Sequence, residues 1–224
     1  MDDASATLDR SNTLLVRAGL RTPRAAAVAG ILFSVLLIVS LWLLWISVPA
    51  DPLEVGAWLR ISSRRVSLAL NLIPFAGVAF MWFLGVLRDR LGSKEDQLFA
   101  TVFLGSGLMF LGMLFVAASG IGGLVQAYTK LTGIPVNAAS LMFGRAFSFG
   151  IMHIYAFKMA AVFMVTTSTL AIRTRITARW IALFGYVSAV FLLFASSYFD
   201  WVFFVFPSWV LLVSADMLVD NSRG

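Results

Sequence analysis

The sequence contains no cysteine and a single histidine among its 224 residues. The absence of cysteine excludes disulfides, thiolate metal sites and cysteine nucleophiles, and it leaves the redox compartment undetermined. A single histidine excludes bis-histidine haem ligation within the chain. Charged residues are also scarce, because they make up 12% of the chain against about 25% in soluble domains. We therefore expect no cofactor and no metal site.

Long apolar runs take the place of charge. Hydrophobic residues make up 60% of the chain, and a membrane-spanning helix needs about 20 mostly apolar residues. The sequence predicts an all-α, polytopic transmembrane bundle of six helices, in which the last two form a tight hairpin or one long broken segment. The six segments are Ala25–Ile46, Val66–Leu87, Leu98–Ala118, Phe147–Ile172, Trp180–Phe199 and Val202–Val219.

The rest of the chain forms short connections. We expect residues 1–24 to be a partly disordered cytoplasmic segment, residues 25–219 to be the transmembrane domain and residues 220–224 to be a cytoplasmic tail. Asp51 and Pro52 offer an N-cap and a proline at the first helical position, which predicts a short interfacial helix before the second segment. The glycine-containing stretch from Ser119 to Arg145 is predicted to be a loop on the bilayer surface or over the bundle.

The distribution of basic residues predicts the orientation. The net charge of +6 would suggest nucleic acid in a soluble protein, but here the charges cluster between apolar runs, so we expect the lipid bilayer and not nucleic acid as a partner. The positive-inside rule favours both termini in the cytoplasm, and a bacterial plasma membrane is the expected location. One side collects Arg10, Arg17, Arg21, Arg24, Arg88, Arg90, Lys94, Arg173, Arg175, Arg179 and Arg223, and the other holds Arg60, Arg64, Arg65, Lys130 and Arg145.

Lys158 is the most informative polar residue, because it lies near the middle of an apolar stretch from Phe147 to Leu170. A cation at that depth is costly and marks a functional site or a partner. The only acid inside an apolar segment is Asp216, so the sequence predicts a buried Lys158–Asp216 pair. That pair either locks two helices together or forms a proton- or ion-responsive site.

Other polar side chains in the apolar segments are suited to hydrogen bonding. His153 and Asn71 are expected to bond between helices, or to line a water path, and Tyr155 lies close to the Lys158 face. The hydroxyls from Thr166 to Thr169 are expected to bond to their own helix backbone. Close helix packing is predicted at three pairs of small residues, which are Ala146/Gly150, Ala156/Ala160 and Gly185/Ala189.

Gly105-Ser106-Gly107, with a histidine on another helix, resembles a fragment of the rhomboid intramembrane-protease pattern. That family has a G-x-S-G motif, with its serine two helices before the histidine. In this chain the motif is shorter and His153 lies on the next helix. The resemblance covers only a few residues and implies an intramembrane serine hydrolase, whereas a glycine packing notch explains the same residues.

Three classes of function remain. The first is a non-enzymatic accessory, assembly or scaffolding component, acting as a homo-oligomer or with a membrane-complex partner. The second is a small transporter or channel for a solute, ion or proton that uses Lys158, Asp216, His153 and Asn71. The third is the intramembrane hydrolase. The chain has no phosphate loop, dinucleotide fingerprint or metal-binding run, and we favour the first class.

Overall fold

The computed structural model describes residues 2–48, 62–91, 97–130, 138–174, 177–196 and 199–223. Side chains are described from residue 24 onward within these ranges, except at 89–91, 97, 130, 200 and 220–223. The interfacial helix that the sequence predicts to begin at Asp51 lies outside the described residues.

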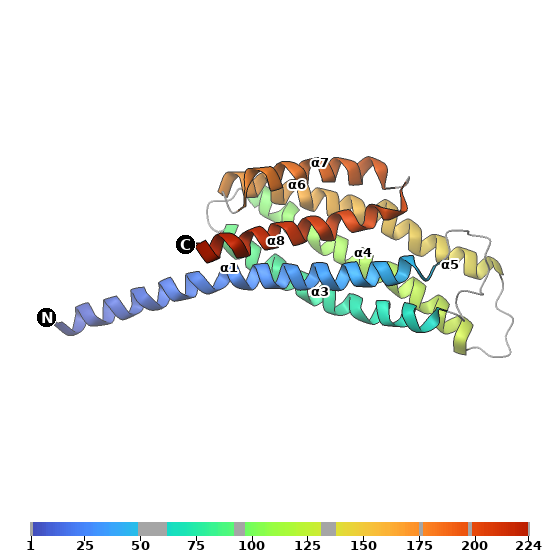
Figure 1. Ribbon diagram of the computed structural model, residues 1–224, viewed down its shortest axis with the longest axis horizontal. Coiled ribbons are helices and arrows are strands. Elements are labelled where there is room, and N and C mark those ends of the chain that lie inside the picture. Colours follow the sequence, from blue (N-terminus) through green and yellow to red (C-terminus); the bar gives the residue numbers. More distant parts are fainter. Residues whose placement is uncertain are drawn as a thin grey trace.

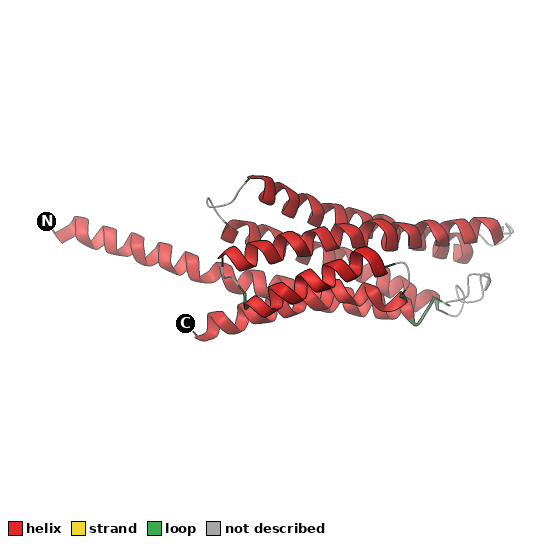
Figure 2. Ribbon diagram, turned by 90° about the horizontal axis from the view of Figure 1, so that it is seen from above, coloured by secondary structure: helices red, strands yellow, loops and turns green. Residues whose placement is uncertain are grey.

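All of the regular structure in the described residues is helical (Figure 2). Five helical spans there are long and apolar enough to cross a membrane, and α7 is a shorter apolar helix. The fold class predicted from the sequence, an all-α bundle of six apolar spans, is therefore confirmed. The elements are α1 (Asp2–Trp45), α3 (Ser63–Leu91), α4 (Gln97–Lys130), α5 (Ala138–Gly150), the π-helical turn η2 (Ile151–Ala156), α6 (Phe157–Thr174), α7 (Arg179–Ala195), the 3-10 turn η3 (Asp200–Phe204) and α8 (Val205–Arg223).

The helices lie side by side along one axis (Figure 1). Helix α1 packs between α3 and α8, α4 packs between α3 and α6, and α7 packs on α6 and α8. Both chain ends lie at one end of the bundle, and α5 lies at the other (Figure 1). The elements α5, η2 and α6 follow one another without a break, so one continuous helical span runs from Ala138 to Thr174.

The centre of the bundle is a cluster of phenylalanines to which five helices contribute. The ring of Phe80 on α3 lies 4.5 Å from Phe33 on α1, 5.7 Å from Phe110 on α4 and 5.5 Å from Phe163 on α6. Phe206 on α8 completes the cluster at 4.6 Å from Phe110. Tilted and edge-on ring pairs at these distances add to the energy of burial, so this cluster fixes how the helices face one another.

The outer surface of the bundle is also apolar. Large side chains such as Phe75, Trp82, Leu183, Val187 and Phe194 are exposed, and they come from helices on different sides of the bundle. Exposed apolar side chains on several helices are compatible with a bundle that lies in a membrane.

The segment from Ser119 to Arg145, predicted to be a loop, is mainly helical. Helix α4 continues to Lys130 and α5 begins at Ala138. Of the glycines that suggested a loop, Gly120 serves helix packing, whereas a Cβ at Gly123 would have no described atom within 4 Å. A Cβ at Gly120 would collide with the hydroxyl of Ser148, and a Cβ at Gly144 would collide with the side chain of Leu124. Gly120 and Gly144 thus let α4 and α5 approach each other closely.

The backbone of the N-terminal segment is helical as well. Helix α1 begins at Asp2, and its first part extends beyond the bundle (Figure 1). Extending an existing helix costs far less than starting a new one, which suits a polar extension of an apolar helix. The partial disorder expected of residues 1–24 stays a prediction.

Candidate functional site

Lys158 lies in the first turn of α6, near the middle of the continuous span from Ala138 to Thr174. Its side chain is exposed on the outside of the bundle. Tyr155, in the preceding turn, is 55% exposed, and Val162 is partly exposed one turn later. These residues define an exposed α6 face, made of Tyr155, Lys158 and Val162. The one cation in the middle of this span therefore points out of the bundle.

Asp216 has a different partner from the one predicted. Its Oδ2 accepts a hydrogen bond of 2.9 Å from the backbone N–H of Ala178, the residue that precedes α7. Lys158 lies about 24 Å from Thr174 along α6, at about 1.5 Å per residue, and Ala178 follows Thr174 closely. The predicted Lys158–Asp216 ion pair is wrong, because the two residues occupy different levels of the bundle.

His153 lies inside the π-helical turn η2 and is buried. Its Nδ1 lies 2.8 Å from the carbonyl oxygen of Ser196 at the end of α7. A carbonyl can only accept, so Nδ1 carries the proton in this hydrogen bond. The imidazole stacks on Phe149, with ring centroids 3.9 Å apart. His153 thus forms the interhelical hydrogen bond expected from the sequence, and the π turn aims its ring toward α7.

A cavity of about 230 Å³ lies beside η2. Its wall is mostly apolar, with Arg145, Ser148 and His153 as the ionisable or hydroxyl side chains that line it. The hydroxyl of Ser148 donates to the carbonyl of Gly144 in its own helix, over 2.9 Å. The other lining residues are Leu41, Leu44, Trp45, Val48, Ile73, Leu114, Ala117, Ala118, Ile121, Phe149, Met152 and Phe203. π-Helical turns are frequent at functional sites, which makes this cavity a candidate ligand site.

The polar residues singled out from the sequence do not meet at this cavity. Asn71 is exposed on α3, and its Nδ2 donates to the carbonyl of Ser67 in the same helix over 2.8 Å. It therefore supports the helix one turn before Pro74 and not a neighbouring helix. Lys158, Asn71 and Asp216 are absent from the cavity lining, whereas His153 is part of it. The arrangement does not assemble the four residues of the predicted transport site.

Ser106 is buried on α4, and its hydroxyl donates to the carbonyl of Phe103 in its own helix over 3.2 Å. The ring of Phe103 packs 5.0 Å from that of Phe163 on α6. His153 precedes Phe163 by about 15 Å along the helical span, so it lies at another level from Ser106. A Cβ at Gly107 would meet Leu84 and Phe163. The glycines around Ser106 therefore include a packing notch, and the geometry contains no Ser106–His153 dyad.

No match was found. No family model, curated protein or solved structure corresponds to the chain. Within the described residues, no group of three or more His, Cys, Asp or Glu side chains could hold a metal ion.

The predicted packing pairs have different outcomes. Ala156 and Ala160 are buried in the core. Ala189 is buried too, and a Cβ at Gly185 would collide with Ser168 and Trp209. The third pair does not pack, because Ala146 is exposed and a Cβ at Gly150 would have no described atom within 4 Å. Small-residue spacing alone cannot tell a packed helix face from an open one.

The prediction for the hydroxyls from Thr166 to Thr169, at the C-terminal end of α6, is only partly correct. Thr166 and Thr169 bond to their own helix backbone as expected, and Thr169 also contacts the Tyr186 hydroxyl at 2.6 Å. The hydroxyls of Thr167 and Ser168 have no hydrogen-bond partner among the described residues. The run of four hydroxyl residues was visible in the sequence, but the direction of each side chain depends on helix rotation.

Proposed function

We propose that this chain is a non-enzymatic component of a membrane complex, and that it assembles with a different membrane protein through the exposed α6 face. The observation that carries the proposal is the exposure of Lys158 in the middle of an apolar span. The proposed setting is a bacterial plasma membrane, with both chain ends in the cytoplasm. That orientation is supported by the arginine-rich segments beside those ends.

A lysine in this position needs a partner. It lies about 20 Å along the helix from Arg145 and about 22 Å from Arg173, the basic residues on either side of it in the span. A lysine stem reaches only about 6 Å, so snorkelling cannot bring the ammonium to either end. Exposure of lysine to lipid at that depth costs about 3 kcal/mol or more. A polar group supplied by another helix removes that cost.

The partner should offer a carboxylate, because an acid near the bilayer centre is the natural counterpart of a lysine there. A second copy of this chain does not supply one. The sequence has no Asp or Glu between Asp96 and Asp200, so α4, α5, η2, α6 and α7 carry no acid. Asp216, the acid inside an apolar segment, already binds Ala178 at another level. Two copies meeting through α6 would instead oppose lysine with lysine, which favours a different protein as the partner.

The exposed α6 face can be tested by site-specific photo-crosslinking in the native membrane. A photoreactive side chain in place of Tyr155 should crosslink to another protein, whereas the same side chain in place of Val187 on α7 should not. Val187 is a matched control because it is also exposed on an apolar helix. The crosslink at position 155 should persist with Lys158→Arg and fall several-fold with Lys158→Met. Lipid adducts alone, or a protein crosslink that is unaffected by Lys158→Met, would refute the proposal.

Charge exchange tests the chemistry of the contact. Once the crosslinked protein is identified, Lys158→Glu should abolish copurification, and replacement of the partner's membrane-embedded acid by lysine should restore it. Restoration only by the matched exchange supports a direct ion pair. A Lys158→Met protein that copurifies normally but has lost a solute flux would favour the transporter class instead.

A further inference from the structure

Three buried hydroxyls at the end of α6 lack hydrogen-bond partners among the described residues. They belong to Thr167, Ser168 and Thr177, whose side chains are 4%, 0% and 9% exposed. Thr166 provides the contrast, because it is equally buried, at 6%, and donates to its own helix at 2.9–3.0 Å. The usual bond of a helical hydroxyl to its own backbone is therefore available here, but Thr167 and Ser168 do not make it.

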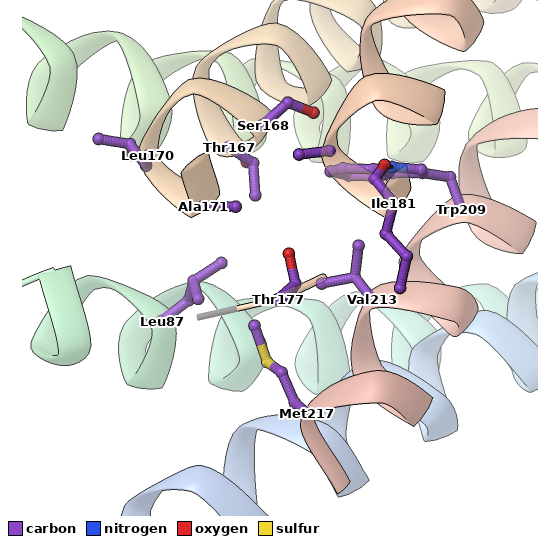
Figure 3. A pocket seen from close by; sticks show the side chains of 11 residues that line it. Leu87, Thr167, Ser168, Leu170, Ala171, Thr177, Ile181, Trp209, Val213 and Met217 are labelled. Carbon is purple, nitrogen blue, oxygen red and sulfur yellow. Dashed lines mark hydrogen bonds between the residues drawn. The ribbon is translucent and has the colours of Figure 1, made fainter. Parts of the chain in front are cut away.

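All three residues are part of the lining of one small cavity. In Figure 3 the Thr177 hydroxyl points from the link between α6 and α7 into the space below Thr167 and Ser168. The cavity measures about 10 Å³, which is close to the smallest volume that holds one water molecule. The remaining wall is largely apolar, formed by Leu87, Leu170, Ala171, Ile181, Ala182, Trp209, Val213 and Met217.

We propose that this cavity is a binding site for a single buried water molecule, held by the hydroxyls of Thr167 and Thr177. The Ser168 hydroxyl points away from this space (Figure 3) and lies against Gly185. A buried hydroxyl without a partner is destabilising, and two such groups at one space suit a water molecule, which makes two to four hydrogen bonds. A hydroxyl both donates and accepts, so the two groups can satisfy both kinds of bond. The lining contains no carboxylate, which favours neutral water over a cation.

The water would connect α6 to the start of α7. Thr177 is adjacent to Ala178, whose N–H binds Asp216 on α8, and the Trp209 indole donates to the Ile181 carbonyl over 3.3 Å on the other side of the space. The water, the carboxylate and the indole together would hold the inner ends of α6, α7 and α8. This inference does not depend on the partner protein proposed above.

Replacement of threonine by valine tests the site through the sign of a stability change. Valine keeps the branched shape and removes only the hydroxyl. With a bound water, Thr167→Val and Thr177→Val should each lower the melting temperature Tm of the detergent-solubilised protein by about 2–4 °C. The double variant should lose less than the sum, because both hydroxyls hold the same water. Thr166→Val is the control and should change Tm by less than either.

Opposite outcomes would refute the water site. If the hydroxyls have no partner, each valine removes a destabilising group and raises Tm. Ser168→Ala serves as a further control and should not lower Tm, because the Ser168 hydroxyl points away from the cavity (Figure 3). A high-resolution structure should show one density peak within hydrogen-bond distance of the hydroxyls, absent from the double variant. A Tm that is higher in sodium chloride than in choline chloride, with the difference lost in the double variant, would assign the site to a cation and overturn the proposal.

Discussion

The hydrogen bond from Ala178 to Asp216 gives the sharpest test of how the bundle is held together. Ala178 immediately precedes α7, and its N–H points at a carboxylate from α8 over 2.9 Å. A negative charge near a helix N-terminus also interacts favourably with the helix dipole. Asp216→Ala removes both contributions and leaves the N–H without its acceptor.

The expected loss can be estimated from comparable interactions. Removing a side-chain acceptor at a helix N-terminus costs about 0.5–2 kcal/mol, and a buried N–H left without a partner costs about 1–3 kcal/mol. Asp216 is only partly buried, so we expect about 1–2 kcal/mol. For a chain of this size that corresponds to a fall in Tm of about 2–8 °C. Asp216→Asn keeps an oxygen acceptor and should lose less.

The partner can be removed independently, because the donor is a backbone group. Ala178 has φ −59°, close to the value of about −65° that proline requires, so Ala178→Pro removes the N–H at little conformational cost to residue 178. Proline at position 178 also restricts the backbone of Thr177. That cost is the same whether residue 216 is Asp or Ala, so it cancels in a double-mutant cycle. Asp216→Ala should therefore cost at least about 0.5 kcal/mol less in the Ala178→Pro protein than in the wild type.

The assay measures unfolding of the purified protein in one detergent. Unfolding is monitored either as loss of tryptophan fluorescence or as the melting temperature Tm. A parallel cycle between Lys158→Met and Asp216→Ala serves as the control and should be additive, since the structure places these residues at different levels. Additivity in the Ala178 cycle would refute the reasoning, and so would strong coupling in the Lys158 cycle.

The remaining predictions concern packing, catalysis and topology. Gly185→Ala should lower Tm by several degrees, because its Cβ would collide with Ser168 and Trp209, whereas Gly105→Ala, with no described atom within 4 Å of its Cβ, should leave Tm unchanged or raise it. Ser106→Ala should leave any phenotype largely intact, and loss of function at normal abundance with labelling by a serine-directed probe would contradict this. Single cysteines introduced at positions 92 and 176 of this cysteine-free chain should be labelled from the cytoplasm. A cysteine at position 133 should be labelled from outside. Labelling of position 176 from outside would refute the orientation.

Some features of the candidate site could be predicted from the sequence, and others could not. Hydropathy placed Lys158 in the middle of an apolar span and His153 inside the same span, and both are found there. The partner of Asp216 was not predictable, because a backbone N–H before a helix leaves no mark in the sequence. The π turn around His153 was also invisible, since it changes the register of the helix without changing its hydropathy.

The sequence by itself determined that the chain forms apolar helices and where most of them lie. These properties follow from the local cost of placing each residue and its backbone groups in an apolar environment. The tertiary structure alone decided that Lys158 faces outward, that Asp216 binds the start of α7 and that Thr167 and Ser168 turn away from their own backbone. Each residue along a helix turns the side chain by about 100°. Partners are therefore set by the rotation and depth of each helix against its neighbours, which the packing of the aromatic core fixes and hydropathy does not.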